Sequence, residues 1–243
     1  MFIDVAFLSD TFLKLCAALP VTLGLFICSF LCGGVLAVGV LALRMSRWPL
    51  LSNVAKGYIL VFRGSPLLIQ LFLIYYGLGQ FGVIRHSFLW PLLREPFICA
   101  VLALALCTAA YTAEILRGAL LAVPSGQIEA GQACGMSRFL LLRSIIAPVM
   151  LRYALPAYST EAILLVKSTA LASLVTVWDV TGVAQQIIQR TYRTMEVFLC
   201  AAVIYLLLNF IIVQLYALLE RRLTPHTRQT PATVALKPAA KGE

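Results

Sequence analysis

The chain has 243 residues, of which 61% are hydrophobic and only 12% charged, against roughly 45–50% and about 25% in soluble domains. A soluble domain of this size could not bury so much apolar surface, because its ratio of surface to volume requires a polar exterior. The net charge of +9 would suggest a nucleic-acid partner in a soluble chain, but here the basic residues lie between apolar runs, as the positive-inside rule describes. We therefore expect an integral membrane protein in contact with lipid, and no nucleic-acid partner.

Five apolar segments are long enough to cross a bilayer as helices, since about 20 apolar residues span its hydrocarbon core. The first lies between Lys14 and Arg44, where no charged residue occurs. Polar stretches separate the segments, and the stretch 179–196 predicts a loop before the last span. The other predicted spans are 58–82, 97–119, a segment within 153–177, and 197–219.

An odd number of spans places the two termini on opposite sides of the membrane. With the N-terminus outside, most Lys and Arg residues face the cytoplasm, which is the orientation that the positive-inside rule predicts. We expect an all-α, polytopic membrane protein with its N-terminus outside and its C-terminus inside. Residues 1–222 form the membrane domain, and the polar residues 223–243 predict a mobile cytoplasmic tail.

The cytoplasmic stretch 123–148 is polar and contains several small residues. A turn signal at 124–126 precedes a predicted short helix that ends at Gly135, and a second amphipathic helix is predicted over 138–147. Two helices joined at a glycine and lying along the membrane are suited to docking in a groove of another protein. The residues that offer a charged anchor or permit close approach are Glu129, Ala130 and Gly131.

The order Glu129-Ala130-Gly131, then Gly135, Ile145 and Pro148, resembles the EAA loop of ABC importer permeases at the family spacing. It departs from the family pattern at Gly131, which replaces the third Ala, and at Ala147, which replaces a Leu. The segments 62–70, 111–118 and 155–161 resemble the polar amino-acid uptake permeases, and the chain is similar to the histidine/lysine/arginine/ornithine and octopine/nopaline group. The resemblance implies the type I importer permease fold in a bacterial inner membrane.

In that family the EAA loop is a coupling helix that inserts into the cytoplasmic ATPase. The resemblance implies a homologous permease subunit in a heterodimer, two ATPase subunits and a periplasmic solute-binding protein. This chain contains no Walker A sequence, so we expect no enzyme activity and no cofactor in it, with ATP and Mg held by the ATPase. The alternative is a polar loop carrying only an interfacial amphipathic helix. The predicted coupling residues are Gln127, Glu129, Ala130, Gly131, Gly135 and Arg138.

Ionisable groups at membrane depth are costly and are therefore functional candidates. Glu161 and Ser168 are seven residues apart and share one face of a helix. We predict that this face lines the translocation path and meets a cationic or zwitterionic substrate, although related permeases commonly carry an Asp where Ser168 stands. The alternative is that Glu161 pairs with Arg63 or Lys167 and holds the spans together.

The second span contains Arg63-Gly64-Ser65-Pro66, where the proline removes a backbone donor and kinks the helix. Carbonyl groups freed in this way must face protein or a wet cavity. Arg63 is interpreted as structural, and Thr112 either lines the path or bonds to its own helix. Glu114 and Arg117 predict an ion pair at the membrane edge. The candidates for the substrate path are Glu161, Ser168, Lys167, Ser65, Gln70 and Thr112.

These features predict the permease subunit of an ATP-driven importer for polar, basic amino acids or opines. A stand-alone secondary transporter or channel for small polar solutes is the alternative, but the internal repeats that would favour it are not evident in the sequence. An intramembrane enzyme would need a catalytic constellation that the sequence lacks. Both rivals predict activity without nucleotide.

Overall fold

The structure, a computed structural model, describes residues 4–223, and its regular elements over that range are all helical. The prediction of an all-α protein is confirmed. Four helical segments are long and apolar enough to cross a membrane, and a fifth span results when a sharply bent pair of helices is counted as one. The segments are Val5–Arg44, Pro96–Leu121, Arg138–Val175, Thr194–Leu223, and the pair Pro49–Gly64 with Leu67–Gln80.

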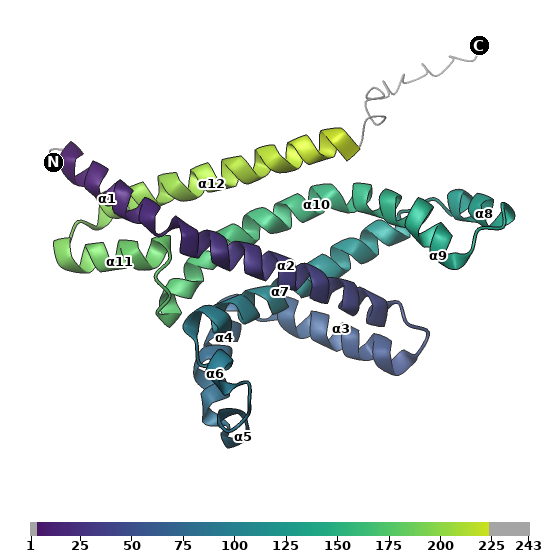
Figure 1. Cartoon of the computed structure of the whole chain (residues 1–243), viewed down its shortest axis with the longest axis horizontal. Coiled ribbons are helices and arrows are strands. Elements are labelled where there is room, and N and C mark those ends of the chain that lie inside the picture. The colour runs from purple at the N-terminus through teal and green to yellow at the C-terminus, as the bar shows by residue number, and fades with distance from the viewer. Residues whose placement is uncertain (1–3, 224–243) are drawn as a thin grey trace, which may run out of the picture.

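The centre of the molecule is a bundle in which α2 packs along α7, and α10 packs against both α7 and α12 (Figure 1). A Cβ atom added at Gly33 of α2 would lie only 3.1 Å from the Ala105 carbonyl oxygen and from Thr108 Cβ of α7. The absence of a side chain at Gly33 therefore lets α2 and α7 pack closely. The bounds of these helices are Leu19–Arg44 (α2), Pro96–Leu121 (α7), Ala147–Ser168 (α10) and Thr194–Leu223 (α12).

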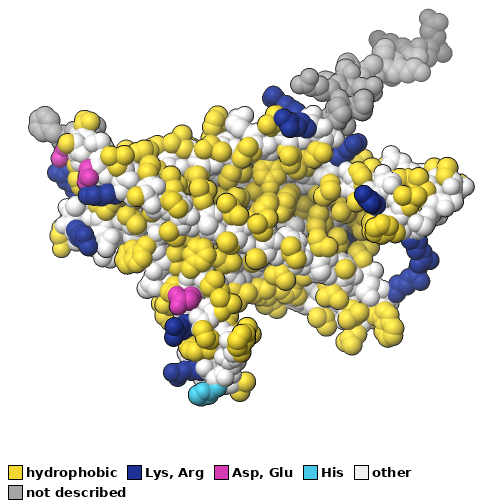
Figure 2. All heavy atoms as spheres, viewed as in Figure 1, with side chains coloured by type: hydrophobic (Ala, Val, Ile, Leu, Met, Phe, Trp, Pro, Cys, Tyr) yellow, Lys and Arg dark blue, Asp and Glu magenta, His cyan; other side chains and the backbone are white. Residues whose placement is uncertain are grey.

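Hydrophobic side chains cover the middle of the face shown in Figure 2, whereas Lys and Arg side chains lie toward its ends and on a projecting arm. Large apolar residues such as Val35, Leu60 and Leu206 are exposed on the helices of the bundle. Such a surface is unfavourable in water and suits a protein that is embedded in lipid.

The second span is broken. Its first part, α3 (Pro49–Gly64), begins earlier than the predicted residue 58 and ends where Ser65 becomes extended. The second part, α4 (Leu67–Phe72), continues through a π-helical turn and a 3₁₀ turn and lies at 106° to α3. The break follows from Pro66, which cannot continue the hydrogen-bond ladder of α3.

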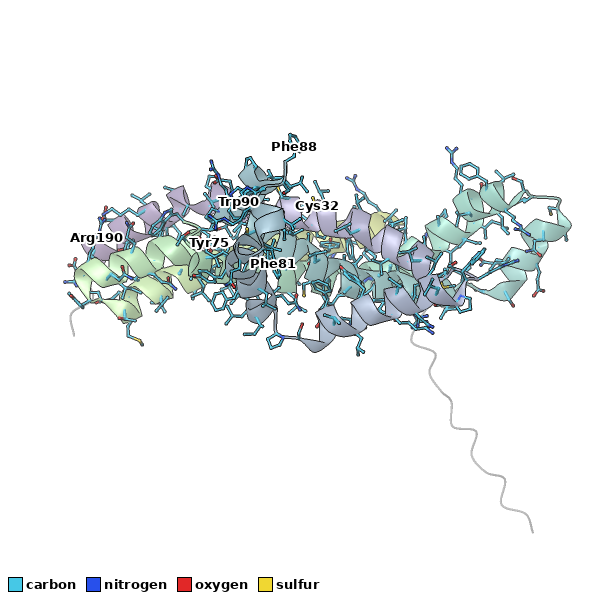
Figure 3. The ribbon with its side chains drawn as sticks, turned by 90° about the horizontal axis from the view of Figure 1, so that it is seen from below. Cys32, Tyr75, Phe81, Phe88, Trp90 and Arg190 are labelled. Atoms are coloured by element: carbon cyan, nitrogen blue, oxygen red, sulfur yellow. The ribbon has the colours of Figure 1, made fainter. Side chains whose placement is uncertain are left out.

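After the break the chain forms an arm that projects from the side of the bundle (Figure 1). The arm contains two single-turn helices, α5 (Gly82–Arg85) and α6 (Trp90–Leu93). Phe88 lies at its outer end, is 95% exposed, and points away from the bundle (Figure 3).

The prediction of a loop over 179–196 is wrong, because a helix, α11 (Val180–Thr191), occupies most of this stretch. Asp179 caps this helix: its Oδ1 accepts a 2.9 Å hydrogen bond from the Gly182 N–H, and its Oδ2 accepts a 3.1 Å bond from the Tyr205 hydroxyl. Burial raises the pKa of the Asp179 carboxyl, and these two hydrogen bonds oppose the shift. The helix escapes notice in the sequence because only its inner side is apolar, where it packs on α12 and on α1 (Val5–Ala17).

The fourth span also begins earlier than predicted. A continuous helical segment runs from α9 (Arg138–Leu141) through a π-helical turn, Leu142–Ile146, into α10, and a 3₁₀ segment, Thr169–Val175, ends it. The second helix predicted for the polar stretch is thus the start of the span. Arg143 and Arg152 lower the hydropathy of this part, which is why the sequence places the start of the span too late.

The ends of the bundle carry different elements (Figure 1). The helices α1 and α11 lie at one end, and α8 (Ser125–Ala133) and α9 lie at the opposite end. The last helix, α12, extends to Leu223, beyond the predicted end at 219. Apart from Leu223, the predicted tail 223–243 lies outside the described residues. The side of the membrane that each end faces remains a prediction.

Candidate coupling and translocation sites

The predicted coupling segment, residues 123–148, contains a helix, a tight turn and a second helix. The C-terminus of α8 is closed by two backbone hydrogen bonds, from the Gly135 N–H to the Gln132 oxygen (2.9 Å) and from the Met136 N–H to the Gly131 oxygen (3.1 Å). Gly135 has φ +74°, the left-handed conformation that this helix ending requires and that glycine adopts without strain. The predicted helix end at Gly135 is confirmed.

The next helix starts immediately after this turn. Ser137 is its N-cap, and its side-chain oxygen accepts a hydrogen bond of 3.3 Å from the Leu140 N–H. A glycine that ends one helix and a serine that starts the next leave only a short connection between them. The helix α9 is therefore joined to the α10 span by continuous helix, and α8 is connected to α9 by the short turn 134–137.

The two helices of the coupling segment pack closely at Gly131, which is buried. A Cβ atom added there would lie 2.5 Å from Leu141 Cδ1 and 2.9 Å from Ile145 Cδ1. The glycine that replaces the third Ala of the EAA pattern therefore lets α8 lie directly against the start of the next helix.

The coupling candidates lie on two different faces of α8. Glu129 is exposed on the face away from the following helix, and no ion pair involves it or the exposed Arg138 within residues 4–223. Gln127, Ala130 and Gly131 instead border a cleft between α8 and the following helix. The sequence could not separate these faces, since the separation depends on how the two helices cross.

The translocation candidates centre on Glu161 of α10, which is only 9% exposed. Arg63 interacts with it electrostatically, and the Arg63 guanidinium lies 5.0 Å from the centroid of the Tyr111 ring. Among the described residues, no ion pair within 4.0 Å joins Glu161 to Arg63 or to Lys167. The direct pairing considered above is thus not formed in this conformation, and the Arg63 guanidinium lies over the Tyr111 ring instead.

The two other candidates on α10 have different environments. The Ser168 hydroxyl donates a 2.8 Å hydrogen bond to the Leu164 carbonyl of its own helix, and Ser168 borders a small apolar pocket with Leu67 and Leu71. Lys167 is exposed, on another face of the helix than the buried Glu161. The role of the Glu161/Ser168 face in transport remains a prediction.

Ser65 and Gln70 come together at the break of the second span. The Gln70 side-chain amide donates hydrogen bonds to the carbonyl oxygens of Phe62 (2.9 Å) and Ser65 (3.1 Å) and to the Ser65 hydroxyl (2.8 Å). The Ser65 hydroxyl in turn donates to the Val61 carbonyl (2.7 Å). These side chains satisfy the polar groups freed at the break, a structural role that sequence reasoning missed; a glutamine four residues after Pro66 was the available signal.

Thr112 of α7 is buried, and its hydroxyl oxygen has no hydrogen-bond partner within the described part of the chain. The interpretation that it bonds to its own helix is therefore wrong. Thr112 borders an apolar groove of about 620 Å³ between α2, α7, α10 and α12.

The ion pair predicted between Glu114 and Arg117 is confirmed at 2.9 Å, and Arg44 of α2 lies 3.6 Å from the other oxygen of the same carboxylate. This cluster joins α2 to α7 near the end of the bundle that carries the coupling segment.

Comparison with known proteins agrees with this geometry. The family described as "Binding-protein-dependent transport system inner membrane component" matches residues 29–225. The chain belongs to this family. It is thus the inner-membrane component of a transport system that depends on a binding protein, and a transport subunit rather than an enzyme.

Two relatives cover nearly the same length. The octopine transport system permease protein OccM of Rhizobium radiobacter is 53% identical over 230 residues, which cover 95% of this chain and 94% of the relative. The histidine/lysine/arginine/ornithine transport system permease protein HisM of Escherichia coli strain K12 is 41% identical over 209 residues, 86% of this chain and 88% of HisM. The resemblance to this group of permeases is confirmed.

The fold is also that of a solved transporter. A chain in a crystal structure of an amino-acid ABC transporter with histidines superposes with a TM-score of 0.80 and 34% sequence identity, covering 91% of this chain and all of that one. The prediction of an ABC importer permease fold is confirmed.

Proposed function

We propose that this chain imports basic amino acids or opines as one of two permease subunits in an ATP-driven complex. The two relatives are named for octopine and for histidine, lysine, arginine and ornithine transport. These compounds share a charged amino-acid group and a side chain that is cationic or weakly basic. The buried Glu161 supports this substrate class, because a carboxylate at membrane depth favours a cationic partner.

The structure of the coupling segment is the observation that supports this proposal. The segment contains a short exposed helix, α8, which ends at Gly135 and is connected by a short turn to the continuous helix that leads into the span containing Glu161. A partner that displaces this helix would therefore act on the proposed substrate path directly. In the complex, two ATPase subunits hold ATP and Mg and bind the Glu129 face, and a periplasmic binding protein delivers substrate at the opposite end.

The proposed orientation follows from the same arrangement. The coupling segment must face the cytoplasm to meet the ATPase, which puts α1 and α11, at the opposite end of the bundle, on the periplasmic side (Figure 1). A heterodimer with a homologous permease completes the path. Substrate contacts in that case are shared between two related chains, and the absence of an Asp at position 168 in this chain fits such a division.

The test is reconstitution of the chain with its candidate permease, ATPase and binding-protein partners in liposomes. We expect ATP-dependent uptake of arginine, histidine or octopine in preference to glutamine. A clear preference for glutamine would overturn the substrate assignment. Uptake by the chain alone, without nucleotide, would instead favour the stand-alone transporter.

A further inference from the structure

A cleft of about 430 Å³ lies between α8 and the helix that follows it in the chain. Its walls are α8 on one side and the start of the helix that leads into α10 on the other. The residues that line it include Ala130, Gly131 and Cys134 on α8, Met136 in the turn, and Ser144 and Ile145 opposite. Glu129 lies on the other face of α8 and does not border the cleft.

The shape of the cleft follows from two local features. Gly131 draws the middle of α8 against Leu141 and Ile145 and so forms the base of the cleft. The opposite wall, with Ser144, is the π-helical turn Leu142–Ile146, a type of distortion that is frequent at functional sites. Met136 and Ile145 are half-buried, whereas Ala130, Cys134 and Ser144 are exposed at the mouth.

The cleft lies beyond the hydrocarbon core of the membrane. The helical segment Arg138–Val175 has 38 residues, whereas about 20 residues cross the core. Its first turns carry Arg138, Arg143 and Arg152, so we place this end of the segment, which carries Ser144, outside the core together with α8. An apolar base that is outside the lipid and open to water favours being covered by a partner.

We propose that this cleft receives an apolar side chain of the ATPase subunit that docks on α8. The inference rests on the proposed function, since it requires that the Glu129 face of α8 binds the ATPase. The helix has nine residues and is about 14 Å long, so a protein that encloses its outer face also reaches the mouth of the cleft beside it. The small residues at the mouth leave room for entry, and the apolar base matches an aliphatic or aromatic side chain.

With this contact, the connection between the ATPase and the permease resists being pulled apart, which a helix held only in a groove does not. A groove that holds α8 transmits a push toward the membrane, but it does not resist withdrawal. An ATPase side chain held between α8 and the next helix resists separation as well. The permease is then driven in both directions, when the ATPase dimer closes and when it opens.

The first test compares two substitutions at Ser144 in the reconstituted complex. Ser144→Leu places a branched side chain in the mouth of the cleft, whereas Ser144→Ala leaves the mouth open. Because added side-chain atoms destabilise a closely fitted contact, we expect Ser144→Leu to lower ATP-driven uptake and ATPase retention by about tenfold. Ser144→Ala should retain more uptake than Ser144→Leu, because it adds no atoms to the cleft. Normal uptake by Ser144→Leu would overturn the inference.

The second test does not depend on a substitution in the cleft. Cys134 is exposed at the mouth, so its alkylation rate is measured in the full complex and in the permeases without ATPase, with Cys134→Ala to assign the signal. We expect protection of at least about tenfold when the ATPase is bound, since a buried thiol is inaccessible to the reagent. Equal rates would show that lipid or nothing covers the cleft, and would overturn the inference.

Different results would refute the cleft contact and the proposed coupling role of α8. Glu129→Cys is cross-linked in the same complex to report docking of the outer face. Cross-linking to the ATPase together with normal uptake by Ser144→Leu would refute the cleft contact and leave the proposed function standing. If Glu129→Cys never cross-links to the ATPase, the proposed coupling role fails as well.

Discussion

Two interruptions of helix in this protein are closed in different ways. Between α8 and α9 the turn is exposed, and the end of α8 is closed by backbone hydrogen bonds at Gly135 and Met136. Between α3 and α4 the break is closed by the side chain of Gln70, which is only 7% exposed and donates to two carbonyl oxygens and a hydroxyl.

The difference reflects the surroundings of each break. Polar groups left over at a turn in water are satisfied by solvent, so a glycine with positive φ is sufficient there. Inside a membrane no water is available, and every freed carbonyl needs a donor from the protein. The α3–α4 break therefore depends on one particular amide side chain, whereas the α8–α9 turn depends on one particular backbone conformation.

The largest effect on stability is expected from Gln70→Leu. It removes the donor to the Phe62 and Ser65 oxygens in a buried site, at a cost of about 2–3 kcal/mol. Thermal unfolding of the purified protein in detergent measures this loss. The matched control is Gln80→Leu near the exposed end of the same segment, where the amide makes a single bond of 3.4 Å to the Tyr76 oxygen. Equal loss in both variants would contradict the role of Gln70.

A smaller effect is expected from Gly135→Ala. An alanine at φ +74° is strained by about 1 kcal/mol, so α8 should fray from its C-terminus and transport should fall. Hydrogen–deuterium exchange over residues 131–141 measures the fraying. Gly126→Ala is the control, since Gly126 is in the same helix without a positive φ; it should slow exchange or leave it unchanged. Faster exchange in the control than in Gly135→Ala would refute the role of the turn.

The smallest effect is expected from Gly131→Ala, which restores the third alanine of the EAA pattern. The added methyl group meets only the ends of two flexible side chains, Leu141 Cδ1 and Ile145 Cδ1, and these can shift at a cost of below about 1 kcal/mol. Exchange over residues 125–148 should therefore change little, whereas Gly131→Leu should disrupt the packing. Severe disruption by alanine would mean that the contact between the two helices is rigid.

Much of the site could be predicted from local patterns. Gly135 and the glutamate–small-residue pattern before it identify the coupling segment, because a helix end and a docking surface are properties of a few neighbouring residues. The same holds for the break at Pro66 and for the ion pair of Glu114 with Arg117. The division of α8 into an outer face with Glu129 and an inner face along the cleft could not be predicted, since it arises from packing against Leu141 and Ile145.

The sequence by itself determined that this is a helical membrane protein, because an excess of apolar residues in runs of about 20 has no other stable arrangement. Only the tertiary structure decided that residues 180–191 form a helix, that Gln70 closes the break in the second span, and that Glu161 is buried. These features depend on contacts between residues that are distant in the chain or on which side of a helix is covered, and no local pattern carries that information.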